Sequence, residues 1–391
     1  MVSDARNNVT VTIFLALVLT SIWYTAGCWP YQAVAGPLSE DLVVSGDVSR
    51  SSSEGNRHEV ALNQTSLIVL REDDNSNIVE RGSRGSRRLA ARFPAFEMPV
   101  DEASYPSASD FEKLKDVEKR VVIYEDEDDF SNYRVKLSPG RPHIKNKYVT
   151  EHILELQTIP LFLEALERGT TKEGGSMGDV QISASDLLKY WNTVSLPASV
   201  ESIGSGDVNK RIPNDRIFQQ LGSWAARSAL LLADEEINAY KARIWQGVDP
   251  QAKTKFKAYV RAWIYDGEDP DPFLRAMRAT RAVFSYMQQP DVKKKWEAIV
   301  NDVERELELI AEHIPAFKKI LWGWDNFLPK FLADRSKKAR HWILWGVDHV
   351  FAEIEEAQND RRATMKDQND VAEVLHALEE STDKGMELEF E

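Results

Sequence analysis

The sequence predicts an all-α fold in which a multi-helix body follows a disordered N-terminal segment. Apolar residues recur at spacings of three and four along the body, which is the period of an amphipathic helix. No stretch combines period-two alternation with hairpin turn signals. The tryptophans beyond the first 35 residues all lie after residue 190, which places the packed core in the C-terminal part.

The N-terminus has the features of a secretory signal peptide over residues 1–35. Arg6 is the last charge before the apolar run from Val11 to Gly27, and small residues follow at Ala33 and Ala35. We therefore expect cleavage between Gly27 and Gly36. An uncleaved signal anchor and a lipoprotein signal are the alternatives, because the apolar run approaches the length of a membrane span and ends in "TAGC".

Residues 36–109 are rich in Ser, Asn, Gly, Arg and acidic residues and show no sustained periodicity. Such a segment buries too little apolar area to offset chain entropy, so it is predicted to be disordered. It contains a glycosylation acceptor at Asn63, and it ends in the basic stretch Glu80–Val100. The single cysteine is Cys28, which signal cleavage after Ala35 would remove.

Residues 110–391 are predicted to form the helical body. Pro290 stands at a first-turn position of one helix, and Ser183 with Asp186 forms a capping-box pattern at the start of another. The helix that starts at Pro290 carries an apolar stripe made of Val292, Trp296, Ile299, Val303, Leu307 and Ile310. The other segments predicted to be helical are residues 152–169, 183–194, 216–247, 255–267, 272–289, 314–335, 339–358 and 365–380.

The body contains no pattern that indicates an enzyme, a metal site or a cofactor site. Gly174–Gly178 reads G-x-S-x-G, but a polar loop precedes it where a nucleophile elbow requires a strand. The acidic run Tyr124–Phe130 lacks calcium-loop spacing and is predicted to be a solvated turn. The formal net charge of −14 also argues against nucleic-acid binding, which requires clustered positive charge.

Residues 263–300 resemble the core of the WY-type helical module found in secreted effectors of oomycete plant pathogens. In that module a helix ends in a turn, Pro-Asp and an aromatic open the next helix, and a proline precedes a Trp-x-x-Tyr helix. Here Ile299 stands at the tyrosine position. The matching core positions are Trp263, Phe273, Trp296 and Ile299.

The order of features before the body is similar to that of the same effectors, in which RxLR and dEER motifs follow the signal peptide. The first degenerate match places Leu70 and Arg71 at the end of RxLR, and Glu80 and Arg81 at the end of dEER. The alternative match uses Arg87 and Leu89. The resemblance implies that this exposed basic segment serves host targeting.

The resemblance implies a secreted effector that enters plant cells, binds host proteins and suppresses defence-associated cell death in the cytoplasm or the nucleus. Anionic lipid headgroups are a further candidate partner of the basic segment. After signal cleavage no stable membrane span is expected. A secreted or surface-attached structural or adhesin-like protein is the alternative function.

Four tryptophans near the C-terminus are candidates for a partner-binding surface. Tryptophans so close together in the sequence cannot all face one core stripe if the helix is regular. The alternative is that a loop between two helices lets both pairs turn inward. The four residues are Trp322, Trp324, Trp342 and Trp345.

Overall fold

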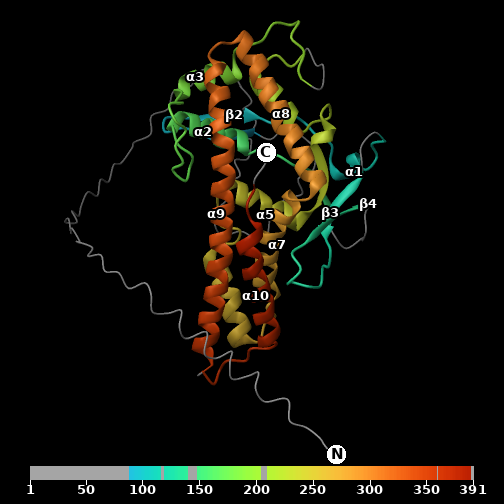
Figure 1. Ribbon diagram of the computed structural model, residues 1–391, viewed down its shortest axis with the longest axis vertical. Helices are drawn as coiled ribbons and strands as arrows, with labels where there is room; N and C mark the ends of the chain where they lie inside the picture. Colours follow the sequence, from blue (N-terminus) through green and yellow to red (C-terminus); the bar gives the residue numbers. More distant parts are fainter. Residues whose placement is uncertain (1–87, 116–118, 140–147, 204–208, 359, 389–391) are drawn as a thin grey trace, which may run out of the picture. The chain divides into compact units, whose positions relative to one another are not determined.

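The structure is a computed structural model that describes residues 88–115, 119–139, 148–203, 209–358 and 360–388. All of these belong to one compact unit of the chain. The predicted signal peptide and Asn63 lie outside the described residues. The described part is mostly helical, as predicted, but it also contains two β-sheets (Figure 1).

The larger sheet corrects the all-α prediction. It has four strands in the order β4-β3-β6-β5, with β3 and β6 parallel and the other pairs antiparallel. Its strands are β3 (Arg120–Tyr124), β4 (Val135–Pro139), β5 (Tyr148–His152) and β6 (Leu230–Asp234). Strand β6 lies in the middle of a segment predicted to be one long helix, and that prediction was wrong.

Burial on both faces explains why the sequence concealed β6. Leu230 and Leu232 pack with Phe111 on one face, whereas Leu231 and Ala233 join the main core on the other. A strand that is covered on both sides is apolar throughout, so it shows no alternation and cannot be told from a buried helix by period alone.

A β-hairpin corrects the predicted disorder boundary at residue 109. Strand β1 (Arg88–Arg92) pairs with β2 (Glu97–Asp101) in antiparallel register. The side chains of Asn192 and Asn214 each donate a 2.8 Å hydrogen bond to carbonyl oxygens of β2. A two-stranded hairpin is marginal on its own, so these contacts from the helical body stabilise it.

The helices surround this framework. They are α1 (Ala108–Phe111), α2 (Thr158–Arg168), α3 (Ala184–Asn192), α4 (Pro213–Leu221), α5 (Glu235–Gln246), α6 (Lys253–Arg261), α7 (Asp271–Met287), α8 (Pro290–His313), α9 (Phe317–Ala357) and α10 (Gln368–Gly385). A 3₁₀ turn (Arg227–Ala229) precedes β6, and a π-helical turn (Ala262–Asp266) extends α6.

Two local predictions are confirmed. Pro290 is the first residue of α8, and the whole predicted stripe of that helix is buried. The Ser183 side chain accepts a hydrogen bond from the backbone N–H of Asp186 at the start of α3. Both features depend only on residues within one or two helical turns, which is why the sequence was sufficient.

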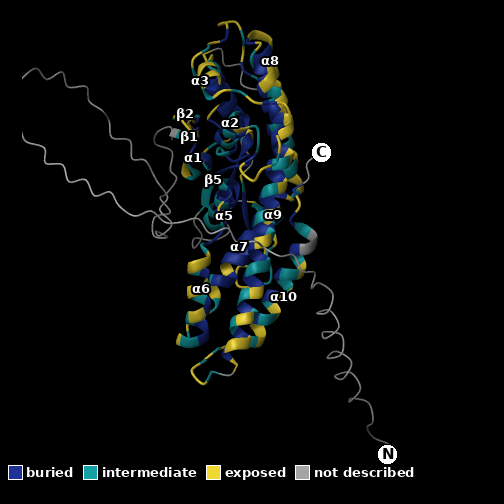
Figure 2. Cartoon of the chain, turned by 90° about the vertical axis from the view of Figure 1, so that its left-hand side faces the viewer, coloured by how far each residue is buried: buried dark blue, intermediate teal, exposed yellow. Residues whose placement is uncertain are grey.

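Helix α9 joins two segments that were predicted as separate helices. It runs for 41 residues and continues through Pro329. It packs against α8 and α10, which lie beside it in Figure 1. Figure 2 shows buried faces of these helices turned toward their neighbours and exposed faces turned outward. In the described part of the chain, no helix has the length and apolarity needed to cross a membrane.

Candidate functional site

The four residues of the WY-like match are core residues. Trp263, Phe273, Trp296 and Ile299 are all buried, as predicted for the tryptophans. The rings of Trp263 and Phe273 lie 5.6 Å apart, and Trp296 contacts Trp245 of α5 with ring centroids 6.4 Å apart. These side chains therefore connect α5, α7, α8 and the π-helical turn, and none of them is available to a partner.

The residues predicted to serve host targeting, Leu70, Arg71, Glu80, Arg81 and Arg87, lie outside the described residues. Leu89, from the alternative match, lies in β1 opposite Val100 and is partly buried. The end of that match is therefore part of a strand rather than of the expected free tether.

The tryptophans of α9 divide between core and surface. Trp324 and Trp342 are buried at 1% and 2% exposure, whereas Trp322 is 59% exposed. Trp345 is half-buried and contacts Lys253 and Phe256. Of the four candidates, only Trp322 presents most of its side chain to solvent.

Trp322 lies on a polar turn of α9. Lys318, Asp325 and Asn326, three and four positions away on the same face, are exposed. The Asn326 amide donates to the Trp322 carbonyl at 2.9 Å. The neighbouring residue Gly323 faces Leu166 so closely that a β-carbon would lie 2.2 Å from the Leu166 side chain. Helix α9 is thus fixed against α2 here, and Trp322, the preceding residue, projects into solvent.

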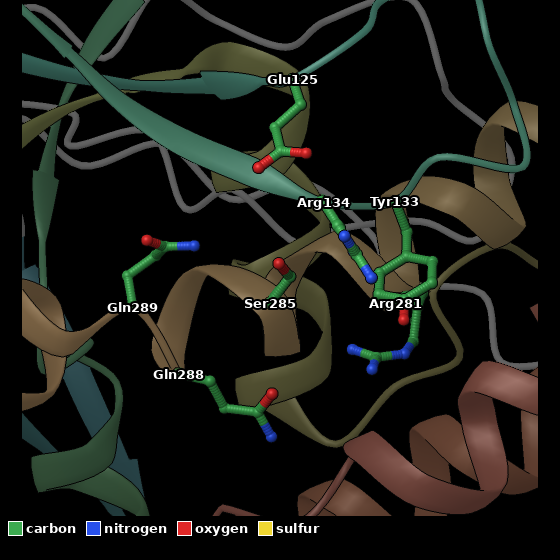
Figure 3. Close-up of a pocket in the computed structure, with 7 residues that line it drawn as sticks. All are labelled: Glu125, Tyr133, Arg134, Arg281, Ser285, Gln288 and Gln289. Carbon is green, nitrogen blue, oxygen red and sulfur yellow. The ribbon is translucent and has the colours of Figure 1, made fainter.

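A polar cleft forms a second candidate site, between the β3–β4 connection and α7. Its first lobe has a volume of about 270 Å³ and continues into a second lobe of about 510 Å³. Tyr133, Arg134 and Arg281 line both lobes. The remaining side chains of the first lobe, drawn in Figure 3, are Glu125, Ser285, Gln288 and Gln289.

Arg281 is the buried cation of this cleft. Its side chain is 4% exposed, and its Nε donates to the Ser381 carbonyl of α10 at 3.3 Å. The guanidinium stacks on the Tyr133 ring, 4.1 Å from the centroid. Gly385 leaves room for it, because a β-carbon there would lie 2.1 Å from Nη2. Burial lowers the pKa of Arg281, and Tyr133 opposes that shift.

The acidic turn that borders the cleft is held from α7. Arg278 donates to the Glu127 carbonyl at 2.8 Å and stacks on the rings of Tyr124 and Phe130. The Ser131 hydroxyl and N–H both donate to Asp129 and lower its pKa. No group of His, Cys, Asp and Glu within the described ranges is arranged to hold a metal ion.

The parallel strands β3 and β6 end beside each other at a second buried polar group. Tyr124 donates to Glu236 at 3.0 Å, and Asp234 accepts from the Glu236 N–H as the N-cap of α5. Burial raises the pKa of Asp234 to about 6. It also raises the pKa of Tyr124 and that of Glu236. This group caps a helix and anchors β3, and none of its three residues lines the cleft.

Sequence reasoning missed both arginines of the cleft. Arg281 was assigned to a helix, and Arg134 lay in an unassigned segment. Their convergence required the sheet, which the sequence did not predict. No protein-family model, curated protein or solved structure matches the chain.

Proposed function

We propose that this protein is a secreted effector that enters host plant cells and suppresses defence-associated cell death by binding host proteins. The sequence support is the order of its features. An N-terminal signal-like run, a basic segment with degenerate RxLR and dEER matches, and a WY-like stretch follow one another as they do in oomycete effectors.

The structural observation that carries the binding part of the proposal is the exposure of Trp322. A tryptophan that is 59% exposed forgoes most of the stabilisation that burial of its ring would supply. Tryptophan is enriched among the residues that dominate protein–protein affinity, because one side chain buries a large area at little entropic cost. Trp322 also stands on a helix packed on its other side, so binding requires no ordering of the backbone there.

The proposal is tested by expression of the protein in leaf cells and measurement of elicitor-triggered cell death. The wild-type protein is expected to reduce cell death, and Trp322→Ala is expected to lose this effect at equal abundance. Trp224→Ala is the matched control, because it removes another exposed tryptophan, 43% exposed, from a different segment.

Two outcomes would count against the proposal. If the folded, abundant wild-type protein changes no defence response, the structural or adhesin-like alternative is favoured. If Trp322→Ala suppresses cell death as well as the wild type does, the binding surface lies elsewhere on the body.

A further inference from the structure

The cleft between the β3–β4 connection and α7 contains the buried guanidinium of Arg281, which the protein leaves partly unsatisfied, and the exposed guanidinium of Arg134. Nη1 of Arg281 is buried and has no hydrogen-bond partner. Arg281 forms no ion pair with any described residue, and the same holds for the Arg134 side chain. Arg281 interacts with the Tyr133 side chain, but Nη1 has no partner, and a buried guanidinium without an anion is costly.

Both arginines face the same space. Figure 3 shows the ends of Arg134 and Arg281 close to each other beside the Tyr133 ring, with the Ser285 hydroxyl nearby. Two like charges in one cleft repel each other, and an anion between them removes that repulsion. From this geometry we infer that the cleft is a binding site for a phosphoryl group carried by a small molecule.

The available donors favour a tetrahedral group over a planar carboxylate. A carboxylate is bound best by two parallel N–H groups of one arginine. The Nε of Arg281 already donates to Ser381, so only the Nη1–Nη2 edge of this guanidinium remains for a ligand. The Ser285 oxygen accepts from the Val135 N–H at 3.3 Å, so its own proton remains available. Arg281 Nη1, the Arg134 guanidinium and the Ser285 hydroxyl approach from separate positions, as the three terminal oxygens of a phosphate require.

The second lobe indicates what the phosphate is attached to. The first lobe has one carboxylate, Glu125, beside the two arginines, whereas the second lobe has two, Asp129 and Glu380, which disfavour a second anionic group there. They suit hydroxyl or ammonium groups, which donate hydrogen bonds to carboxylates. The second lobe, at about 510 Å³, falls in the size range of small-molecule sites, about 300–1,000 Å³. The ligand class is therefore a phosphate monoester with a polar, uncharged or cationic remainder. This inference does not depend on the host role of the protein.

The test is a binding titration of the full chain. Calorimetry measures the affinity for each probe, and thermal unfolding measures the change in Tm. The probes are inorganic phosphate, glycerol phosphate and acetate, each at the same ionic strength set with sodium chloride. We expect saturable binding of phosphate with a rise in Tm, because a ligand that binds only the folded state stabilises it. Glycerol phosphate is expected to bind more tightly than free phosphate, and acetate is expected not to bind.

Three variants localise the site. Arg134→Ala removes an exposed side chain and should weaken phosphate binding by about tenfold or more, the scale of one lost charge-assisted hydrogen bond. Arg281→Met should abolish binding. Arg305→Ala removes an exposed arginine from α8 and should bind like the wild type. If Arg281→Met does not fold, Arg134→Ala and Ser285→Ala decide the question.

Several results would overturn the inference. If neither phosphate nor glycerol phosphate binds saturably, the cleft is not a phosphate site. Binding that survives Arg134→Ala and Ser285→Ala would place it elsewhere. Acetate affinity equal to that of phosphate would refute the tetrahedral group. Equal affinity for free phosphate and glycerol phosphate would refute the role of the second lobe.

Discussion

Two buried arginines, Arg216 and Arg281, lie in different regions of the molecule and differ in how many of their donors the protein satisfies. Arg216, between α4 and α8, is fully buried and pairs with the buried carboxylate of Glu306. It also donates to the carbonyl oxygens of Val200, Glu201 and Lys210. Arg281, between α7 and the β3–β4 connection, has one carbonyl partner and interacts with the ring and the hydroxyl of Tyr133.

The partners of Glu306 complete the first network. Its second oxygen accepts from the Ile203 N–H at 2.8 Å and from the side chains of Ser202 and Gln220. The protein satisfies the donors of Arg216 and the acceptors of Glu306, so the network stabilises residues 200–203 and Lys210, which precede α4. Arg281 differs, because its Nη1 has no partner within the protein. We infer that a ligand from solution supplies that partner. Buried charge alone therefore does not mark function, and Arg281 differs from Arg216 in that it has no carboxylate partner among the described residues.

The largest expected change in the free energy of unfolding comes from breaking the Arg216–Glu306 network. Arg216→Met leaves the Glu306 carboxylate buried without a cation, and it should lower the free energy of unfolding by about 3–5 kcal/mol. Urea unfolding measures the change. The double variant Arg216→Met/Glu306→Met is the control and should recover most of the loss, because matched apolar residues can replace a buried pair. A single-variant loss below about 1 kcal/mol would show that the network is not structural.

Asp234 tests the contrast between paired and unpaired buried charges from the acidic side. Its carboxylate forms no ion pair with a described residue. Its pKa is about 6 in the folded state against 3.8 ordinarily, so the folded state holds the proton more tightly. Stability from this group is present below pH 4 and is lost as the pH rises from about 4 to about 6. Asp234→Asn keeps an N-cap and should raise the free energy of unfolding at pH 7 by roughly 2–3 kcal/mol.

The prediction for Asp234 is checked by measuring, as a function of pH, the difference in the free energy of unfolding between Asp234→Asn and the wild type. The difference should shrink as the pH falls from 6 to 4, because the wild-type carboxyl becomes protonated in the folded protein. A difference that stays constant over this range would mean that the amide acts through packing or capping instead of charge.

Arg281→Met should change stability far less than Arg216→Met. It loses one hydrogen bond and the contact with Tyr133, but it also removes an unpaired buried charge, so the two effects offset each other to within about 1 kcal/mol. Urea unfolding without added phosphate provides the measurement. A loss as large as that of Arg216→Met would show that Arg281 is as fully integrated as Arg216, and the comparison would fail.

The smallest expected effect is at Trp322. Trp322→Ala should alter the free energy of unfolding by less than about 0.5 kcal/mol, as is usual for exposed positions. The matched buried variant, Trp324→Ala two residues away, should cost about 3–5 kcal/mol. Thermal or urea unfolding of both variants compares their losses in the free energy of unfolding directly. Equal losses would mean that Trp322 packs against the body in solution and is not free to contact a partner.

Most of the helical body could be predicted from the sequence, but the sheet and the cleft could not. The stripe of α8 and the cap of α3 repeat or pair within a few residues, so a linear pattern contains them. Strand β6 satisfies its backbone through β3 and β5, which are distant in the sequence. Its apolar run fits a helix or a strand equally well, and only the presence of those partners decides between them.

The sequence by itself determined which segments are amphipathic, where several helices begin and that the chain carries a large negative charge. Those properties depend on side-chain identity and on spacings of one to four residues. The tertiary structure alone decided which charges are paired. Arg216 and Glu306 are 90 positions apart, and Arg134 and Arg281 meet only because β4 packs against α7. Electrostatic interactions act through space, so their outcome is fixed by the fold and not by any local pattern.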